Sequence, residues 1–169
     1  MYKRQQFTYE YDANGNLITQ TEIATGGVTN YVWDAQDQLI GINNTDGSTV
    51  AYAYDALGRR SAKVLGAIRE LYAYDGEDIY LEVDENNTVQ ARYAHGDRVD
   101  TPLAFERGGA EFYYHTDHQG SIRQVTDGTG TVVNQYSYDS YGQFIERVET
   151  VAQLYGYTAR EQDLSLIHI

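Results

Sequence analysis

The chain has no cysteine, one proline and no long apolar run among its 169 residues. Without cysteine, the fold uses neither disulfide bonds nor thiolate metal ligands. With Pro102 as the only proline, the turns must depend on glycine, asparagine and aspartate. The basic residues after Met1 are not followed by an apolar stretch, so we expect neither a signal peptide nor a membrane span in this segment.

Basic residues are also scarce. Lysine and arginine total 12 against 25 aspartates and glutamates, which gives a formal net charge of −13. A nucleic-acid ligand requires basic stripes that neutralise phosphates, and this sequence has none. We therefore expect no nucleic-acid partner, and a surface charge that favours solubility.

Tyrosine and glycine are abundant, with 17 and 16 copies, which is typical of a β-rich chain with many turns. The clearest pattern is the corner Tyr-Asp-x-x-Gly, which begins at Tyr11, Tyr54 and Tyr138, with degenerate copies at Trp33 and Tyr74. A steady interval between corners indicates one supersecondary unit copied several times. The turn aspartates, spaced 22, 21, 20, 22, 20 and 22 residues apart, are Asp12, Asp34, Asp55, Asp75, Asp97, Asp117 and Asp139.

The corner has a physical explanation. Aspartate at the first position of a type I turn accepts hydrogen bonds from the following backbone N–H groups. Glycine three residues later tolerates a positive φ and allows the returning strand to leave through a bulge. We predict a structural role, as repeat corners, for Tyr11, Asp12, Gly15, Trp33, Asp34, Tyr54, Asp55, Gly58, Tyr74, Asp75, Asp97, Tyr114, Asp117, Gly120, Tyr138, Asp139 and Gly142.

A second series of turn signals alternates with the corners. Two turns per period imply two strands per period, so thirteen turn signals predict about fourteen strands in consecutive hairpins. The strands that enter the corners carry aromatic residues two positions apart, as in Tyr31/Trp33 and Tyr52/Tyr54, which places both rings on one face. The predicted fold is all-β: serial antiparallel hairpins of about 21 residues in a curved, spiralling sheet with open edges.

Tyr-Asp-x-x-Gly-x-Leu at this period resembles the YD repeat of RHS and teneurin-type proteins. The run from Tyr114 through Asp117 and Gly120 to Arg123, which continues to the corner at Tyr138, resembles the start of the RHS repeat-associated core. The segment from His95 to Leu103 is similar to the stretch that precedes that core. The resemblance spans about residues 7–163 and divides the chain into YD-repeat hairpins (1–110), the start of the core (111–163) and a tail that matches no repeat (164–169).

The resemblance implies a role as well as a fold. In that family the repeats form a hollow β-shell that encloses a C-terminal toxic domain, and the core caps the shell. It implies that this chain is a fragment of such a shell, that its partners are the rest of the shell and the enclosed toxin, and that the parent is secreted or associated with the cell envelope. The family's self-cleavage motif is missing here, so we assign no self-cleavage.

Three site hypotheses can be weighed from the residues. His115, Asp117 and His118 offer ligand types that suit Zn²⁺, but the two histidines have opposite strand parity and Asp117 holds the turn position. Loops such as Asp127-Gly128 lack the ligand spacing of a calcium loop. We therefore expect no metal, no cofactor and no catalytic residues. The alternative to a shell is a glycan-binding adhesion surface, because exposed tyrosine ladders suit carbohydrate stacking.

Overall fold

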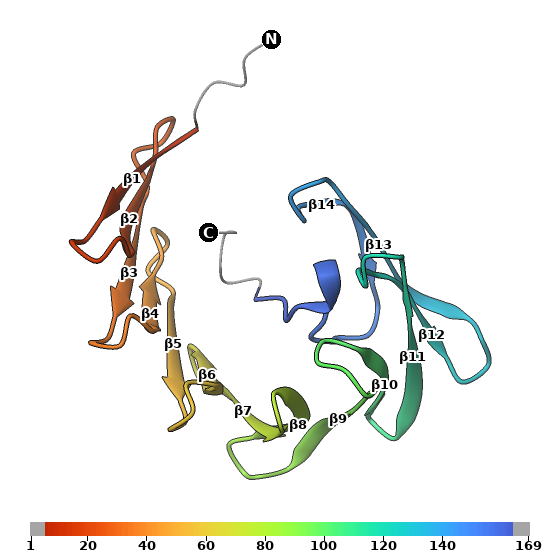
Figure 1. Cartoon of the computed structure of the whole chain (residues 1–169). Coiled ribbons are helices and arrows are strands. Elements are labelled where there is room, and N and C mark those ends of the chain that lie inside the picture. The colour runs from red at the N-terminus through yellow and green to blue at the C-terminus, as the bar shows by residue number, and fades with distance from the viewer. Residues whose placement is uncertain (1–5, 164–169) are drawn as a thin grey trace. The chain divides into compact units, whose positions relative to one another are not determined.

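A computed structural model describes residues 6–163, and its regular secondary structure is almost entirely β (Figure 1). The predicted tail at 164–169 lies outside the described residues. The described part contains no α-helix, only a single 3₁₀ turn, η1, at Tyr157–Ala159. Fourteen strands precede it, the number that the turn signals predicted: β1 (Phe7–Tyr11), β2 (Leu17–Glu22), β3 (Val28–Trp33), β4 (Leu39–Asn43), β5 (Thr49–Tyr54), β6 (Arg60–Leu65), β7 (Ile68–Asp75), β8 (Asp78–Asp84), β9 (Val89–His95), β10 (Pro102–Arg107), β11 (Ala110–Thr116), β12 (Ile122–Asp127), β13 (Val132–Tyr138) and β14 (Phe144–Glu149).

The strands form one ladder in which every strand is hydrogen-bonded to the strands before and after it in the sequence. Neighbouring strands run antiparallel, as in the pairs Phe7↔Glu22 and Phe105↔Phe112. This order confirms the predicted series of hairpins. The chain divides into two compact units: the first ends at Leu71, and the second begins at Tyr72. The boundary predicted at residue 110 is a division between family segments and stays a prediction.

A β-bulge follows five of the corners at an equivalent position. In the first hairpin, Tyr11 pairs with Leu17 and Glu10 pairs with Thr19, so Ile18 is the extra residue. A bulge inserts one residue into one strand and so reverses the side-chain parity of the residues beyond it. The other four extra residues, found in the same way from the register, are Ile40, Ser61, Arg123 and Ile145.

The bulge determines which residues of the departing strands are buried. Leu17 and Gln20 of β2 are buried three positions apart, and so are Ile122 and Val125 of β12. Simple alternation would bury residues two positions apart. In five of the entering strands, β3, β5, β9, β11 and β13, the predicted alternation holds, as at Val50 and Tyr52 of β5.

The core of each unit lies on one face of its part of the ladder. In the unit that ends at Leu71, the buried apolar residues are Leu17, Tyr31, Leu39, Ile42, Val50, Tyr52 and Ala62. In the unit that begins at Tyr72, a larger cluster contains Ile79, Ala91, Tyr93, Phe105, Phe112, Tyr114, Ile122, Val125, Tyr136 and Tyr155. Tyr155 comes from the segment after β14, so this second core has a covering layer that is not a strand of the ladder.

Candidate functional site

Five of the predicted corners share one hydrogen-bond pattern, of which Asp55 is an example. Its backbone N–H donates to the carbonyl of Arg59 (2.9 Å), and its own carbonyl accepts from the N–H of Gly58 (3.0 Å). Its Oδ1 accepts from the N–H groups of Leu57 (2.9 Å) and Arg59 (3.0 Å). The carboxylate therefore satisfies two backbone donors that the turn leaves without a strand partner. The same pattern is present at Asp12, Asp34, Asp117 and Asp139.

The fifth corner residue, three positions after the aspartate, adopts a left-handed conformation in each of these turns. Gly15 has φ +92°, and Gly58, Gly120 and Gly142 have values from +80° to +83°. Glycine adopts this region without the steric cost that a Cβ imposes. The degenerate corner after Asp34 places Asp37 there, at φ 59°, one of the few non-glycine types that tolerate it.

Two corners that the sequence analysis did not assign have this geometry as well. Asp84 and Asp127 each accept two backbone N–H groups at Oδ1, at 2.8–3.0 Å. Asn87 and Gly130, three residues later, have positive φ. The three-residue spacing from Asp84 to Asn87 and from Asp127 to Gly130 is that of a corner. Both turns belong to the second series of turn signals, which predicts only hairpin connections.

The degenerate corner at Tyr74-Asp75 and the aspartate placed by interval, Asp97, lie in different surroundings. Asp75 is the last residue of β7, and a tight turn at Gly76-Glu77 leads into β8. Asp97 lies in the longer loop between β9 and β10, where the N–H of Gly96 donates to the carbonyl of Thr101 (2.8 Å). At Asp75 and Asp97 the interval of about 21 residues still gives the position of a turn along the ladder, but the turn is not a five-residue corner.

The aromatic residue before the aspartate connects neighbouring hairpins. The Nε1–H of Trp33 donates to the carbonyl of Leu17 (2.8 Å), and the hydroxyl of Tyr54 donates to the carbonyl of Leu39 (2.8 Å). Tyr138 packs instead against Phe144, with ring centroids 5.0 Å apart. Of the other predicted aromatic positions, Tyr11 is exposed, Tyr74 is half-buried and Tyr114 is buried.

Hydrogen bonding lowers the pKa values of several turn carboxyls. The backbone N–H of Asn16 holds the pKa of Asp12 below its usual value, and the hydroxyl of Thr129 does the same for the pKa of Asp127. The guanidinium of Arg59 makes the largest contribution to the lowered pKa of Asp55. The ionised form is the one that accepts these hydrogen bonds, so the turns are built for charged aspartate.

Buried tyrosine hydroxyls are paired with polar side chains of neighbouring strands. Tyr31 donates to Oε1 of Gln20 (2.8 Å), and Tyr93 donates to Oε1 of Glu82 (2.9 Å). Arg107 forms an ion pair with the same glutamate. Burial raises the pKa of Tyr93 far above its ordinary value. These rings are therefore neutral, hydrogen-bonded parts of the sheet, and not acid–base groups at physiological pH.

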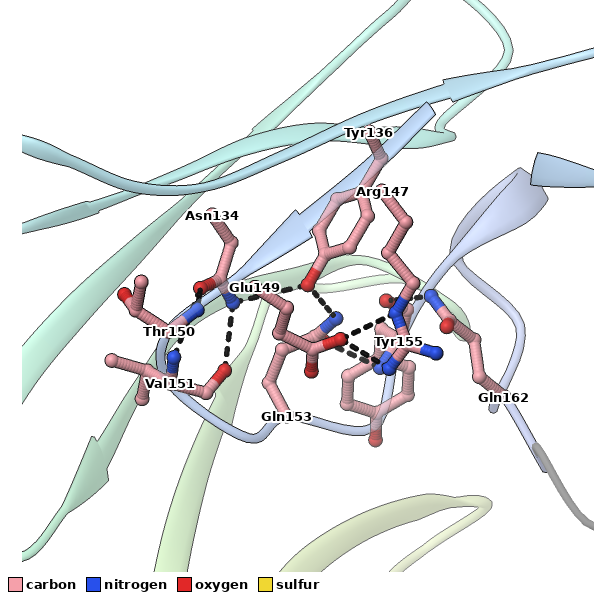
Figure 2. A network of polar contacts seen from close by, with 9 residues as sticks. All are labelled: Asn134, Tyr136, Arg147, Glu149, Thr150, Val151, Gln153, Tyr155 and Gln162. Carbon is pink, nitrogen blue, oxygen red and sulfur yellow. Dashed lines mark hydrogen bonds and ion pairs between the residues drawn. The ribbon is translucent and has the colours of Figure 1, made fainter. Parts of the chain in front are cut away.

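Residues 150–163, here called the strap, leave β14 and pack on the second unit. Asn134 of β13, which is fully buried, holds the start of the strap (Figure 2). Its Oδ1 accepts from the N–H groups of Thr150 (2.9 Å) and Val151 (3.1 Å), and its Nδ2 donates to the carbonyl of Val151 (2.7 Å). Nδ2 also donates to the hydroxyl of Tyr136 (3.0 Å), which accepts from Gln153 as well. One amide therefore satisfies three backbone groups of the strap.

Further along, the strap inserts the ring of Tyr155 into the aromatic core. The ring makes edge-to-face contacts with Tyr93 (centroids 5.5 Å apart) and Tyr114 (6.0 Å), and its hydroxyl lies 3.0 Å from Nε2 of His95. The carbonyl of Gly156 accepts from the N–H of Ile122 at 2.9 Å. The strap is thus fixed by both rings and backbone bonds.

The described residues do not bring together the side chains of a metal site. Within residues 6–163, no group of three or more His, Cys, Asp or Glu side chains is placed to hold a metal ion. His115 contacts Oγ1 of Thr126 (2.9 Å), His118 is exposed, and Oδ1 of Asp117 is used by its turn. A surface cavity of about 280 Å³ lies between the Asp117 and Asp139 corners, lined in part by Arg123. No helix in the described part is long and apolar enough to cross a membrane.

Serial hairpins with Tyr-Asp corners define a β-repeat protein. The model of the Teneurin YD-shell family matches residues 1–169, the whole chain. The chain belongs to this family.

Curated relatives support the assignment. The chain is 32% identical over 136 residues to the tRNA nuclease WapA of Bacillus subtilis (strain 168), a match that covers 78% of this chain and 6% of the relative. It is 30% identical over 167 residues to double-stranded DNA deaminase toxin A of Burkholderia cenocepacia (strain H111), covering 82% of this chain and 12% of that protein. The chain therefore spans only a small part of the relatives that it matches.

Solved structures share the fold. The structure of a Tc holotoxin pore from Photorhabdus luminescens matches with a TM-score of 0.53 and 14% identity, over 94% of this chain and 11% of that chain. At this identity the likeness is evidence for the architecture alone, and it agrees with the predicted shell-type sheet.

Proposed function

We propose that this chain is a non-catalytic segment of a shell wall that encloses a polypeptide cargo, a toxin domain, within a longer parent protein. The observation that carries the proposal is the uninterrupted hairpin ladder of a YD-shell family member. The proposal includes the curvature that a shell requires. It also includes a parent protein that is secreted or associated with the cell envelope.

The chemistry of the described residues suits a wall. The polar side chains that are buried, such as Gln20 and Asn134, are used for hydrogen bonds that hold strands or the strap. The conspicuous aspartates are used by their own turns. Two relatives are named as a nuclease and a deaminase toxin, and we propose that any such activity of the parent belongs to its cargo and not to this segment.

The adhesion alternative requires stacked rings that a sugar can reach. Tyr31, Tyr93 and Tyr136 are only 2–4% exposed, so the aromatic face is used within the protein. The exposed tyrosine rings of the described residues do not follow successive strands as a ladder would: they are Tyr9 and Tyr11 on β1, Tyr80 on β8, Tyr113 on β11 and Tyr141 in the turn before β14. No observation favours glycan binding over a wall.

Protease protection of the cargo tests the proposal. In the purified parent protein, the polypeptide that follows the shell should resist a protease that digests the same polypeptide when it is expressed alone. Ile122→Asp, which places a charge in the core of the wall, should make the cargo sensitive. Leu57→Asp, at an exposed turn residue, should leave it protected. Equal digestion of free and parent-borne cargo would refute enclosure.

A further inference from the structure

The contact between His95 and Tyr155 joins the end of β9 to the strap. Nε2 of His95 lies 3.0 Å from the hydroxyl of Tyr155, and the two rings meet edge to face with centroids 5.4 Å apart. Tyr155 is 3% exposed, and His95 is half-buried. A histidine therefore forms one side of the socket that holds a deeply buried ring of the strap.

We propose that His95 is an acid-sensitive latch for the strap: protonation of its imidazole weakens the docking of residues 150–163 on the second unit. The neutral ring forms a single hydrogen bond to Tyr155 and otherwise packs against an aromatic edge. The imidazolium carries two N–H donors and a charge, and the docked strap covers part of that charge. Release of the strap returns the ring to water.

Charged groups of the neighbouring elements interact electrostatically with His95. Asp78 of β8 and Asp100 of the β9–β10 loop favour the imidazolium, and both carboxylates already have partners. Oδ1 of Asp78 accepts from the N–H of Asp100 (3.2 Å), and Oδ2 of Asp100 pairs with Arg160 of the strap (3.1 Å).

Tyrosine and glutamate groups around Tyr155 complete the surroundings. Tyr74 and Glu161 interact electrostatically with Tyr155, and burial keeps the tyrosine hydroxyl protonated by raising its pKa. Burial outweighs the two aspartates at His95, because the pKa of His95 is lowered from its ordinary value with desolvation as the largest cause.

The direction of the pH effect follows from this balance. A lowered pKa means that the docked state binds fewer protons than the released state. The contribution of His95 to docking is complete above the ordinary histidine pKa of about 6.5 and is lost as the pH falls below it toward the docked value. The pKa values of Asp12, Asp55 and Asp127 are lowered from the ordinary aspartate value of about 3.9, so these carboxyls titrate in a separate, more acidic window.

Hydrogen exchange measured on the 169-residue chain tests the latch. After correction for intrinsic rates, strap amides should exchange several-fold faster at about pH 5.5 than at about pH 7.5, a range that spans the ordinary histidine pKa. Val151 and Thr158 report on the strap directly, because their N–H groups donate to Asn134 and to Ser121. The amides of β2 and β4 should not change.

Two variants distinguish the latch from general acid effects. His95→Gln keeps a polar group next to Tyr155 but cannot titrate, so its strap exchange should be independent of pH over this range. His115→Gln replaces an exposed histidine of β11 and should behave like the unmodified chain. In an NMR titration, Asn134→Ala, which removes the amide that holds the start of the strap, should raise the pKa of His95 toward its ordinary value, which tests the coupling without a change at the histidine itself. The latch is refuted if strap exchange in the unmodified chain is the same at both pH values, or slower at the acidic one.

Discussion

The indole Nε1–H of Trp33 donates a 2.8 Å hydrogen bond to the carbonyl of Leu17, sixteen residues earlier in the chain. The hydroxyl of Tyr54 repeats this contact with the carbonyl of Leu39, fifteen residues earlier. The aromatic residue of a corner thus binds the first residue of the departing strand in the hairpin before it. This contact explains why a Tyr or Trp precedes the aspartate there: only those rings reach the carbonyl with a donor.

Tyr54→Phe removes this donor and leaves the ring in place. We expect a loss of about 1 kcal/mol in the free energy of unfolding, the net value of one hydrogen bond of this kind. Urea denaturation followed by circular dichroism measures it. Tyr141→Phe, whose ring is 87% exposed, is the control and should change nothing. Equal stability of both variants would mean that the bond to Leu39 contributes nothing.

Gly15→Ala should destabilise the chain through its backbone alone. Gly15 has φ +92°, and an added Cβ would meet no atom within 4 Å, so no steric overlap complicates the effect. A non-glycine residue in this conformation costs about 1–2 kcal/mol. Gly128→Ala is the matched control, since that glycine is also in a turn with open space but lies outside the left-handed region. There the substitution should be neutral or stabilise by less than about 1 kcal/mol. Thermal unfolding of both variants decides the question.

The sequence predicted the hairpins because their signals are local. Aspartate and a glycine three residues later form a turn without help from distant residues, and the pairs of rings on entering strands fix the buried face. The bulges at Ile18 and Ile40 changed the burial pattern of the departing strands, and no residue type marks an inserted position. At Asp75 the Tyr-Asp pair and the interval predict a corner, but neither specifies the length of the turn, and the chain turns tightly at Gly76-Glu77.

The strap could not be predicted in the same way. Its docking depends on Asn134 and Val151, 17 residues apart, and on His95 and Tyr155, 60 residues apart. Such contacts follow from the tertiary packing of the ladder. In the sequence, Asn134 is one polar residue among many. His95 occupies an aromatic position of the repeat, two residues after Tyr93, which predicts a packed ring but not its partner in the strap.

Asn134→Ala should release the beginning of the strap. The substitution leaves the N–H groups of Thr150 and Val151 and the carbonyl of Val151 without their partner. Each buried polar group that loses its partner costs about 1–3 kcal/mol, and water that enters after release limits the total, so we expect roughly 3 kcal/mol. Denaturation gives the total, and hydrogen exchange of residues 150–156 localises it. Gln135→Ala, at an exposed neighbour on β13, should have little effect, and slow exchange of the strap in Asn134→Ala would contradict this role.

The aspartate turns should make the fold sensitive to strong acid. The pKa values of Asp12, Asp84 and Asp127 are lowered, with backbone or side-chain hydrogen bonds to each carboxylate as the largest cause. Folding therefore favours the ionised form, so its stabilisation is complete above the ordinary pKa of about 3.9 and is lost as the pH falls through the lowered values. The melting temperature should decrease steeply in that window. Asp127→Asn should reduce the steepness, whereas Asp97→Asn, outside a five-residue corner, should leave the profile unchanged.

The first and last strands of the ladder should cause self-association. β1 and β14 each have one neighbour in the strand order of the described residues, and both expose apolar side chains: Tyr9 is 46% exposed and Ile145 is 71% exposed. An unpaired edge is a template for another strand. We expect oligomers whose size increases with concentration in light scattering. Tyr9→Lys combined with Ile145→Lys should reduce them, because edge lysines disfavour strand addition. Leu57→Lys changes a 78% exposed residue in a turn and should not. A monomer at high concentration before any substitution would show that the edges of the isolated chain do not pair.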